Sequence, residues 1–153
     1  MTLSRRKALA LIGGGAILAA TASLAAIAGR WPRTAALPWK MAGTETDPRR
    51  RALSYALLAP NPHNRQPWLV DLREADVVTL YVDTGKLLPP TDPLNRQITI
   101  GLGCFLELMR MAASHDGQRV TITVFPEGAD PDALDTRPVA RAVFASDPTV
   151  TPD

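Results

Sequence analysis

The sequence predicts an α+β fold in which helices pack on a mostly antiparallel sheet. Its periodic segments follow the order helix, two strands, helix, strand, strand. The first two strands are joined by the short segment Arg73-Glu74-Ala75-Asp76, a link that suits an antiparallel hairpin. The longest helical segment is apolar along one side, as expected of a helix that covers a sheet.

The amino terminus has the pattern of an export signal. Three basic residues, Arg5 to Lys7, precede a stretch without charged side chains, residues 8–28, which ends in the triplet Ala26-Ile27-Ala28. A basic start, an apolar middle and a small-x-small end are typical of a cleavable signal, so we assign residues 1–28 to a signal helix. The apolar run is also long enough to cross about 30 Å of hydrocarbon, which leaves an uncleaved membrane anchor open.

The segment Ser4-Arg5-Arg6-Lys7-Ala8-Leu9 resembles the twin-arginine translocation signal, in which paired arginines precede a weakly hydrophobic stretch. It departs from that pattern at Ala8, where an aromatic residue is common. The resemblance implies a bacterial protein that the twin-arginine translocation machinery exports already folded, often with a cofactor inside. Such a protein would be periplasmic, or membrane-anchored through an uncleaved signal.

Charge and cysteine content argue against two kinds of partner. After residue 28 the chain has 14 basic and 15 acidic residues, and no basic stripe interleaves with aromatic residues. We therefore expect no nucleic-acid partner. One cysteine and two histidines do not suffice for a metal site, and we expect none. Cys104 is expected to be a buried small hydrophobe.

Residues 29–47 are interpreted as a linker with basic and aromatic residues close together, around Trp31 and Trp39. Such a segment can anchor at a membrane interface, but we expect Trp39 to pack on the domain that follows. Asp47 and Pro48 then suit the N-cap and first position of a helix. The arginines at 49–51 occupy the first turn, the unfavourable end of the helix dipole, and either bind an anion or form a solvated face.

The remaining elements follow from periodicity and turn signals. Apolar residues at helical spacing predict the first helix to about Leu58 and a long helix from about Leu94 to Ser114, with Gly117 as its C-cap. Alternating or continuous apolar segments predict strands over 68–72, 77–82, 120–125 and 140–144.

The loop between the first helix and the first strand is unusual for a small domain. The segment ALLAPNPHNRQPWLVDL, residues 56–72, combines three prolines with amides, a histidine and a tryptophan. Neutral amides such as Asn64 and Gln66 offer donors and acceptors, which suits the edge of a flavin ring. In an extended segment these two side chains point to the same side, and the prolines lower the entropy lost on binding. The alternative is a proline-rich turn whose amides bond to neighbouring backbone groups.

Residues 59–68, Ala-Pro-Asn-Pro-His-Asn-Arg-Gln-Pro-Trp, resemble the flavin loop of the nitroreductase superfamily. Further motifs of its exported two-lobed branch follow in order as Tyr81-Val82-Asp83, Leu87-Leu88-Pro89, Asp92-Pro93, Asn95-Arg96-Gln97 and Ile100-Gly101-Leu102-Gly103.

The resemblance implies a nitroreductase-like lobe that binds FMN. It places His63 at the phosphate or ribityl side of the cofactor and Asn64 and Gln66 at the ring and ribityl, and Pro62 is a further cofactor-binding candidate. Trp68 is expected to pack in the core or at a dimer seam rather than on the cofactor.

Two features of the long helix complete the candidate site. Arg96 near its start is a further candidate for the cofactor because it can hold an anion beside free backbone N–H groups; the alternative is an ion pair with Asp92 or Glu107. Gly101 and Gly103 lower helix propensity, so we expect them to permit close packing of another backbone or a partner helix.

The resemblance stops short of a whole flavin site. The Arg-x-Ser-x-Arg-type element that holds the FMN phosphate in the family is not found, and nothing basic follows Arg141. We therefore interpret residues 48–146 as an incomplete flavin-binding lobe, and residues 147–153 as a tail or a linker to a missing second half. The site would be completed by that second lobe or in a homodimer.

The leading functional hypothesis is an exported FMN-dependent oxidoreductase of nitroreductase type. It would reduce nitro- or quinone-like acceptors with NAD(P)H or another electron donor, and no side chain would act as a catalytic acid or base. The alternatives are a flavin-sequestering module without turnover and a truncated, non-catalytic fragment.

Overall fold

The computed structural model describes residues 4–30, 34–130 and 132–152. It divides the chain into two compact units, Met1–Leu37 and Pro38–Asp153, which are considered separately. The expected boundaries at residues 28, 47 and 146 stay predictions. The part of the expected linker around Trp31 lies outside the described residues.

The first unit contains one apolar helix, α1, Arg5–Gly29. The stretch Arg5–Ile27 is long and apolar enough to cross a membrane by length and composition, and none of its most apolar part is buried. A helix of this length and composition at the amino terminus is compatible with a signal or an anchor.

The second unit begins within a short helix, α2, Leu37–Met41, none of whose residues is buried. Trp39 is 71% exposed, so the expectation that it packs on the domain is wrong. Beyond α2 the chain is tied down again, because the Gly43 N–H donates to Ser54 Oγ at 2.8 Å.

The lobe begins with helix α3, Pro48–Ala56, at the residue that the sequence predicts. The Asp47 carboxylate accepts the Arg49 N–H at 2.9 Å, so Asp47 is the N-cap, and Pro48 occupies the first turn, where no N–H is needed. One face of the helix buries Ala52, Leu53 and Ala56.

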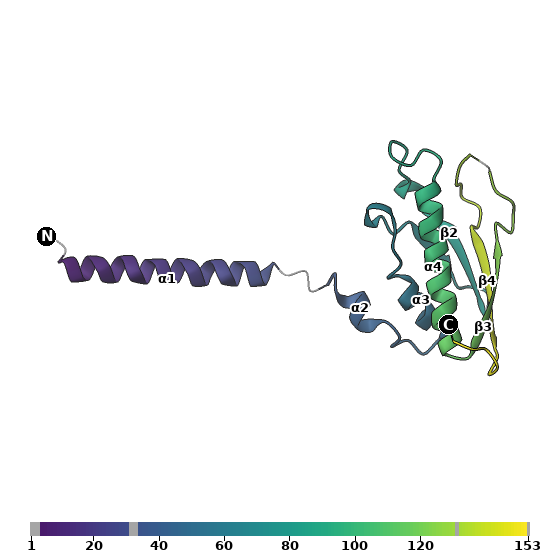
Figure 1. Cartoon of the computed structure of the whole chain (residues 1–153), viewed down its shortest axis with the longest axis horizontal. Coiled ribbons are helices and arrows are strands. Elements are labelled where there is room, and N and C mark those ends of the chain that lie inside the picture. Colours follow the sequence, from purple (N-terminus) through teal and green to yellow (C-terminus); the bar gives the residue numbers. More distant parts are fainter. Residues whose placement is uncertain (1–3, 31–33, 131, 153) are drawn as a thin grey trace. The chain divides into compact units, whose positions relative to one another are not determined.

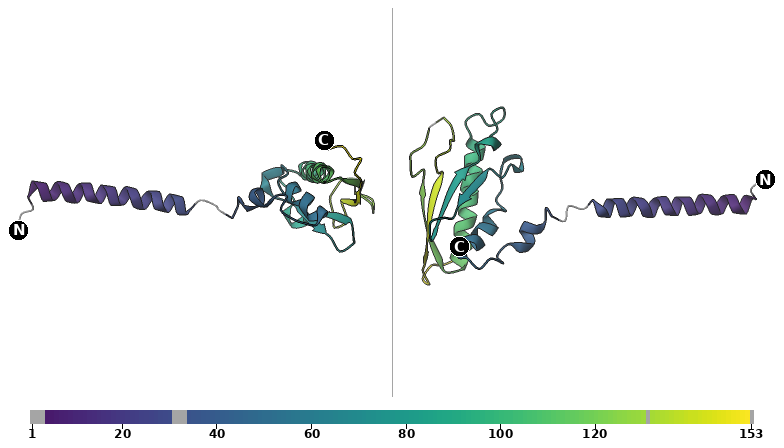
Figure 2. Two further views of the ribbon diagram at one scale, coloured as in Figure 1. Left: turned by 90° about the horizontal axis from the view of Figure 1, so that it is seen from below. Right: turned by 180° about the vertical axis from the view of Figure 1, so that it is seen from behind.

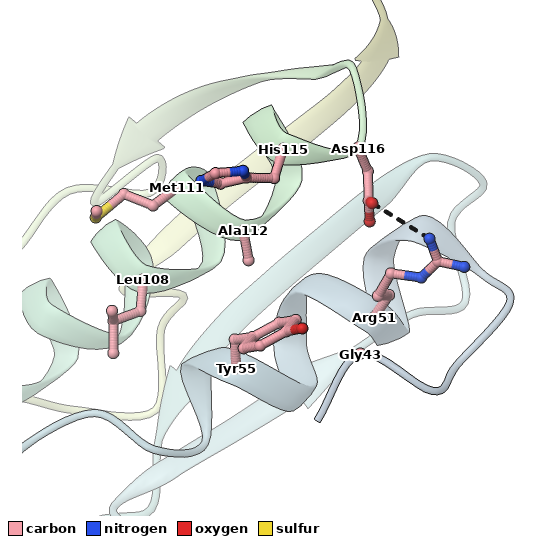
Figure 3. A pocket seen from close by; sticks show the side chains of 8 residues that line it. All are labelled: Gly43, Arg51, Tyr55, Leu108, Met111, Ala112, His115 and Asp116. Atoms are coloured by element: carbon pink, nitrogen blue, oxygen red, sulfur yellow. Dashed lines mark hydrogen bonds and ion pairs between the residues drawn. The ribbon is translucent and has the colours of Figure 1, made fainter. Parts of the chain in front are cut away.

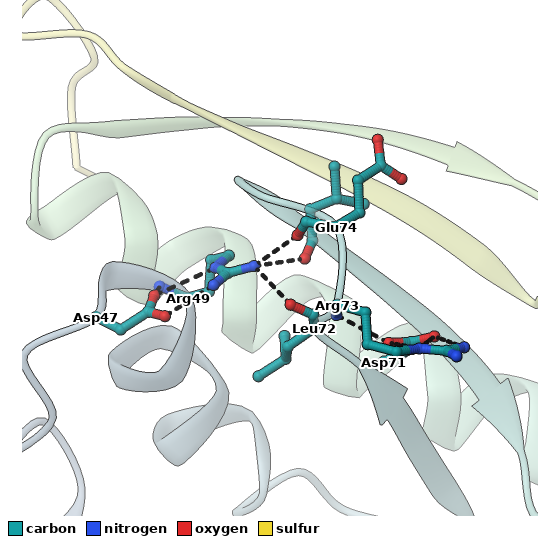
Figure 4. A network of polar contacts seen from close by, with 7 residues as sticks. Asp47, Arg49, Asp71, Leu72, Arg73 and Glu74 are labelled. Carbon is teal, nitrogen blue, oxygen red and sulfur yellow. Dashed lines mark hydrogen bonds and ion pairs between the residues drawn. The ribbon is translucent and has the colours of Figure 1, made fainter.

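Arg49 joins the start of α3 to a hairpin of the sheet (Figure 4). Its guanidinium pairs with Asp47 at 2.9 Å and donates to the carbonyls of Leu72, Glu74 and Val77 at 3.2, 2.8 and 3.2 Å. The hydrogen-bonded guanidinium lowers the pKa of the Asp47 carboxyl. Arg49 is therefore a structural clamp, and for this residue both expected roles, anion ligand and solvated side chain, are wrong.

The four strands form one antiparallel sheet in the order β1-β2-β4-β3. The hairpin between the first two strands confirms the prediction from the short 73–76 link, with Trp68 opposite Val82 and Asp71 opposite Thr79. The strand bounds are β1 Trp68–Asp71, β2 Val77–Val82, β3 Gln118–Val124 and β4 Ala140–Ser146.

Helices α3 and α4, Arg96–His115, lie side by side on one face of this sheet (Figures 1 and 2). The core between the layers is made by alternate strand residues such as Leu80, Ala142 and Phe144 and by the inner face of α4, including Leu102 and Phe105. The α+β class and the packing of helices on an antiparallel sheet are thus confirmed.

Helix α4 starts two residues later than the sequence indicates. Asn95 has φ 54°, outside the helical region, and the buried Asp92 carboxylate accepts the Ile98 N–H at 3.0 Å, which fixes the first turn. At the other end Gly117 has φ 64°, a conformation that favours glycine after a helix, as expected.

Replacing Arg49 with Ala is predicted to lower the free energy of unfolding by about 2–3 kcal/mol, because three carbonyls of the hairpin, two of them in part-buried contacts, lose a charged donor. Urea denaturation followed by circular dichroism measures this loss. Arg50→Ala is the matched control, since Arg50 is the next residue and is exposed. Equal stability of the two variants would contradict the clamp.

Candidate functional site

The side chain of Asn61 closes the loop that the sequence singles out. Its Oδ1 accepts the Gln66 N–H at 2.7 Å, and its Nδ2 donates to the Ala59 carbonyl at 3.1 Å. These two bonds join both ends of the loop through one amide. Asn61 was not among the predicted site residues, although an Asn that bonds to nearby backbone is a common turn signal.

The backbone within the loop is not extended. A short 3-10 turn, η1, spans Pro62–Asn64, and His63, Asn64 and Gln66 have φ of 51°, 51° and 48°. The prediction that Asn64 and Gln66 point to the same side assumed an extended segment, and that assumption is wrong. Left-handed backbone is tolerated by Asn and uncommon for Gln, and such strain in a loop is typical of ligand-binding positions.

The loop is fixed to the neighbouring turn η2, Thr84–Lys86. Arg65 Nε donates to the Lys86 carbonyl at 3.2 Å, and Lys86 Nζ donates to the Gln66 carbonyl at 3.1 Å. Arg65 is thus engaged with the protein. After the loop, Pro67 is fully buried and Trp68 packs against Phe105 with ring centroids 4.9 Å apart, which confirms the core position expected for the tryptophan.

Gly101 allows the loop to lie against helix α4. A Cβ at this position would come within 3.3 Å of Pro62 Cδ and 3.4 Å of Asn61 Cβ, closer than ordinary contacts. The close backbone approach expected of Gly101 is therefore confirmed. Gly103 differs, because a Cβ there would meet no described atom within 4 Å.

Four of the predicted site residues present polar side chains on the surface. His63, Asn64 and Gln66 lie on the loop, and Arg96 lies in the first turn of α4, about 7–8 Å along the helix axis from Gly101. All four are exposed, and within the described part of the chain none has a side-chain hydrogen bond or ion pair. In particular, Arg96 makes no ion pair with Asp92, whose carboxylate instead caps the helix.

An open hollow of about 300 Å³ lies where the loop meets α4. Of the predicted site residues, Pro62 lines this hollow. The other four are close to the lining residues along the chain but are not part of the wall: His63, Asn64, Gln66 and Arg96. The wall is apolar apart from two amides and consists of Pro60, Asn61, Pro62, Gln97, Ile100, Gly101 and Cys104.

A second hollow, of about 490 Å³, continues along the exposed face of α4. It shares Pro60, Ile100 and Cys104 with the first and extends to Leu108. Ile100 is 66% exposed, and Cys104 is half-buried rather than fully buried as expected. This face of the lobe is therefore a continuous apolar surface beside the loop.

A further hollow, of about 510 Å³, lies at the opposite end of α4 (Figure 3). Tyr55 from α3 and Met111 and His115 from α4 line it, and the Arg51–Asp116 ion pair, 3.2 Å long, lies at its edge. The sequence did not indicate this hollow, because its residues come from segments far apart in the chain. Its arginine is already paired, so the surface offers a ligand few free polar groups.

Within the ranges that the structure describes, no group of three His, Cys, Asp or Glu side chains is placed to bind a metal ion. The chemistry available at the loop is that of neutral amides, one imidazole and one guanidinium beside an apolar wall. Such a set can hold a planar ligand with a polar rim.

Comparison with known proteins agrees with this picture. No family model matches the chain. Over 102 residues it is 31% identical to a Mycobacterium tuberculosis protein named "Putative NAD(P)H nitroreductase acg". The matched region covers 67% of this chain and 30% of that protein. It is also 34% identical over 90 residues to the "Uncharacterized protein Rv3127" of the same organism, over 57% of this chain and 26% of that one. The chain thus matches about a third of the length of these relatives.

A crystal structure of a "Putative NADH Oxidase" from Clostridium acetobutylicum has the same fold over 67% of this chain and 77% of its own, with a TM-score of 0.50 and 12% identity. The first likeness is to a protein named as a nitroreductase, and the structural likeness shows a shared fold. The part of the second unit from helix α3 onward is referred to below as the nitroreductase-like lobe.

The two helix glycines are predicted to respond differently to alanine. Gly103→Ala should raise stability by up to about 1 kcal/mol, because alanine favours helix and its methyl enters open space. Gly101→Ala should lack this gain, since its methyl crowds Pro62 and Asn61. Thermal denaturation of both variants tests the contact, and a similar stabilisation by the two alanines would show that the loop does not press on the helix.

Proposed function

We propose that the nitroreductase-like lobe binds FMN and forms part of an exported oxidoreductase of nitroreductase type, which reduces nitro- or quinone-like acceptors. The observation that supports this most directly is the strained loop at residues 61–66, which Asn61 closes and which leaves polar side chains without protein partners. The printed name of the acg relative agrees with an oxidoreductase, although the chain matches 30% of that relative's length.

The residues present fit such a cofactor. Asn64 and Gln66 would bond to the rim of the flavin ring and the ribityl chain, and His63 and Arg96 would face the phosphate side. Pro62 and the apolar wall beside it would lie against the ring. When bound, FMN supplies the transfer of hydride between a nicotinamide donor and an acceptor, and the protein supplies orientation and electrostatics.

The site on this chain is open, so we infer that a second lobe or a second copy of the chain covers the cofactor. The apolar surface from Pro60 along Ile100 and Cys104 to Leu108 would be the contact for that cover, which would shield the ring from water. NAD(P)H or another electron donor would then approach the assembled site.

The apolar helix α1 supports export or anchoring. We propose that the twin-arginine translocation machinery recognises its start, where Arg5, Arg6 and Lys7 precede the uncharged stretch. The protein would then be periplasmic, or held at the membrane by the uncleaved helix.

Removing both loop amides is predicted to release the flavin. Asn64→Ala with Gln66→Ala should weaken FMN binding by about 10- to 100-fold, because each amide contributes on the order of 1 kcal/mol in hydrogen bonds. Titration of FMN fluorescence with the purified full chain measures this change. Thr123→Ala, an exposed position on strand β3, is the control and should bind as the unaltered chain does. Unchanged binding by the double variant would refute the roles of the two amides.

Turnover distinguishes an enzyme from a flavin store. With FMN bound, NADPH is predicted to bleach the flavin absorbance without oxygen, and a nitroaromatic compound should restore it. A protein that dithionite bleaches but NAD(P)H does not would be a flavin-sequestering module. A chain that stays colourless after FMN is added would leave only a non-catalytic fragment.

A further inference from the structure

The short helix α2 exposes three large apolar side chains between α1 and the lobe. Leu37, Trp39 and Met41 are 44%, 71% and 54% exposed, and no residue of the helix is buried. Leu37 and Met41 are four residues apart and therefore share a helix face. Trp39 is two residues from each of them, so its ring projects from the other side of this short helix. Large apolar side chains exposed on both sides of a helix indicate surroundings other than water.

Charge along the chain indicates what that surface meets. Residues 29–44, which follow the apolar helix, contain three basic residues and no acidic residue, and one of the three, Lys40, belongs to α2 itself. Residues 45–153 contain 11 basic and 15 acidic residues, a formal charge of −4. An anionic lipid surface would therefore attract α2 and its flanks and repel the lobe.

The length of chain between the two helices limits where α2 can be. Seven residues, 30–36, separate the end of α1 from the start of α2, and a fully extended segment of this length reaches about 25 Å at most. When α1 crosses a bilayer, α2 must stay within that distance of the membrane surface. Aromatic and basic residues in this position are typical of segments at the lipid–water interface.

We propose that α2 binds in the headgroup region of an anionic bilayer. The ring of Trp39 would lie at headgroup depth, Leu37 and Met41 would reach the upper acyl chains, and Lys40 would pair with lipid phosphate. The interaction adds a second, interfacial contact to the spanning helix. It concerns residues outside the proposed flavin site, and a failure of flavin binding would leave it untouched.

The test uses the full chain reconstituted in vesicles of equimolar phosphatidylcholine and phosphatidylglycerol, with and without bromine on the acyl chains. The fluorescence emission of Trp39 is obtained by subtracting the emission of the Trp39→Phe variant from that of the unaltered chain. Trp39 is exposed, so the substitution is expected to leave the fold intact. Brominated lipid is expected to reduce this emission by about twofold, and iodide in the water should leave it nearly unchanged. Urea denaturation checks that Trp39→Phe unfolds as the unaltered chain does.

A matched reporter on the lobe controls for general proximity to lipid. Val124→Trp in the Trp39→Phe background places a tryptophan at a 61% exposed site on strand β3, and iodide should quench it while bromine does not. Quenching of Trp39 by iodide alone would place α2 in water and overturn the proposal. Protection from both quenchers would overturn it in favour of a protein cover, and a chain that fails to float with the vesicles would also refute it.

Discussion

The contact between helix α4 and the loop at Gly101 is the constraint on which the candidate site depends. The helix can approach Asn61 and Pro62 this closely because glycine has no side chain. Asn61 in turn closes the loop, and the left-handed backbone of His63, Asn64 and Gln66 lies within that closure. Because the loop then enters strand β1 through the buried Pro67 and Trp68, the helix, the loop and the sheet hold one another.

Helix α3 connects this site to the other end of the lobe. Its amino end is joined through Arg49 to the carbonyls of the β1–β2 hairpin, and its carboxyl end leads directly into the loop. The first hairpin is therefore held at its turn by polar bonds and at its open end by the packing of Trp68 on Phe105. Polar and apolar contacts thus fix different ends of the same hairpin.

Local signals in the sequence predicted most of the fold. Asp47 predicted the start of α3, Gly117 predicted the end of α4, and the 73–76 link predicted the hairpin. These three features could be predicted because each is determined by residues that are neighbours in the chain. The clamp of Arg49 was missed because its carbonyl partners lie 23 to 28 residues away. The sequence located the loop but not its shape, since left-handed backbone at His63 and Gln66 leaves no mark in residue type. The exposure of Trp39 depends on what surrounds it in space, which composition does not reveal.

The strand order leaves both edges of the sheet without a neighbour among the described residues. Strand β1 ends the sheet on one side with four residues, and strand β3 ends it on the other with seven. Each edge presents unpaired peptide groups that can accept an additional strand. The longer β3 edge is the stronger template, so the lobe on its own is open to growth of its sheet by a neighbouring molecule, and its association should rise with protein concentration.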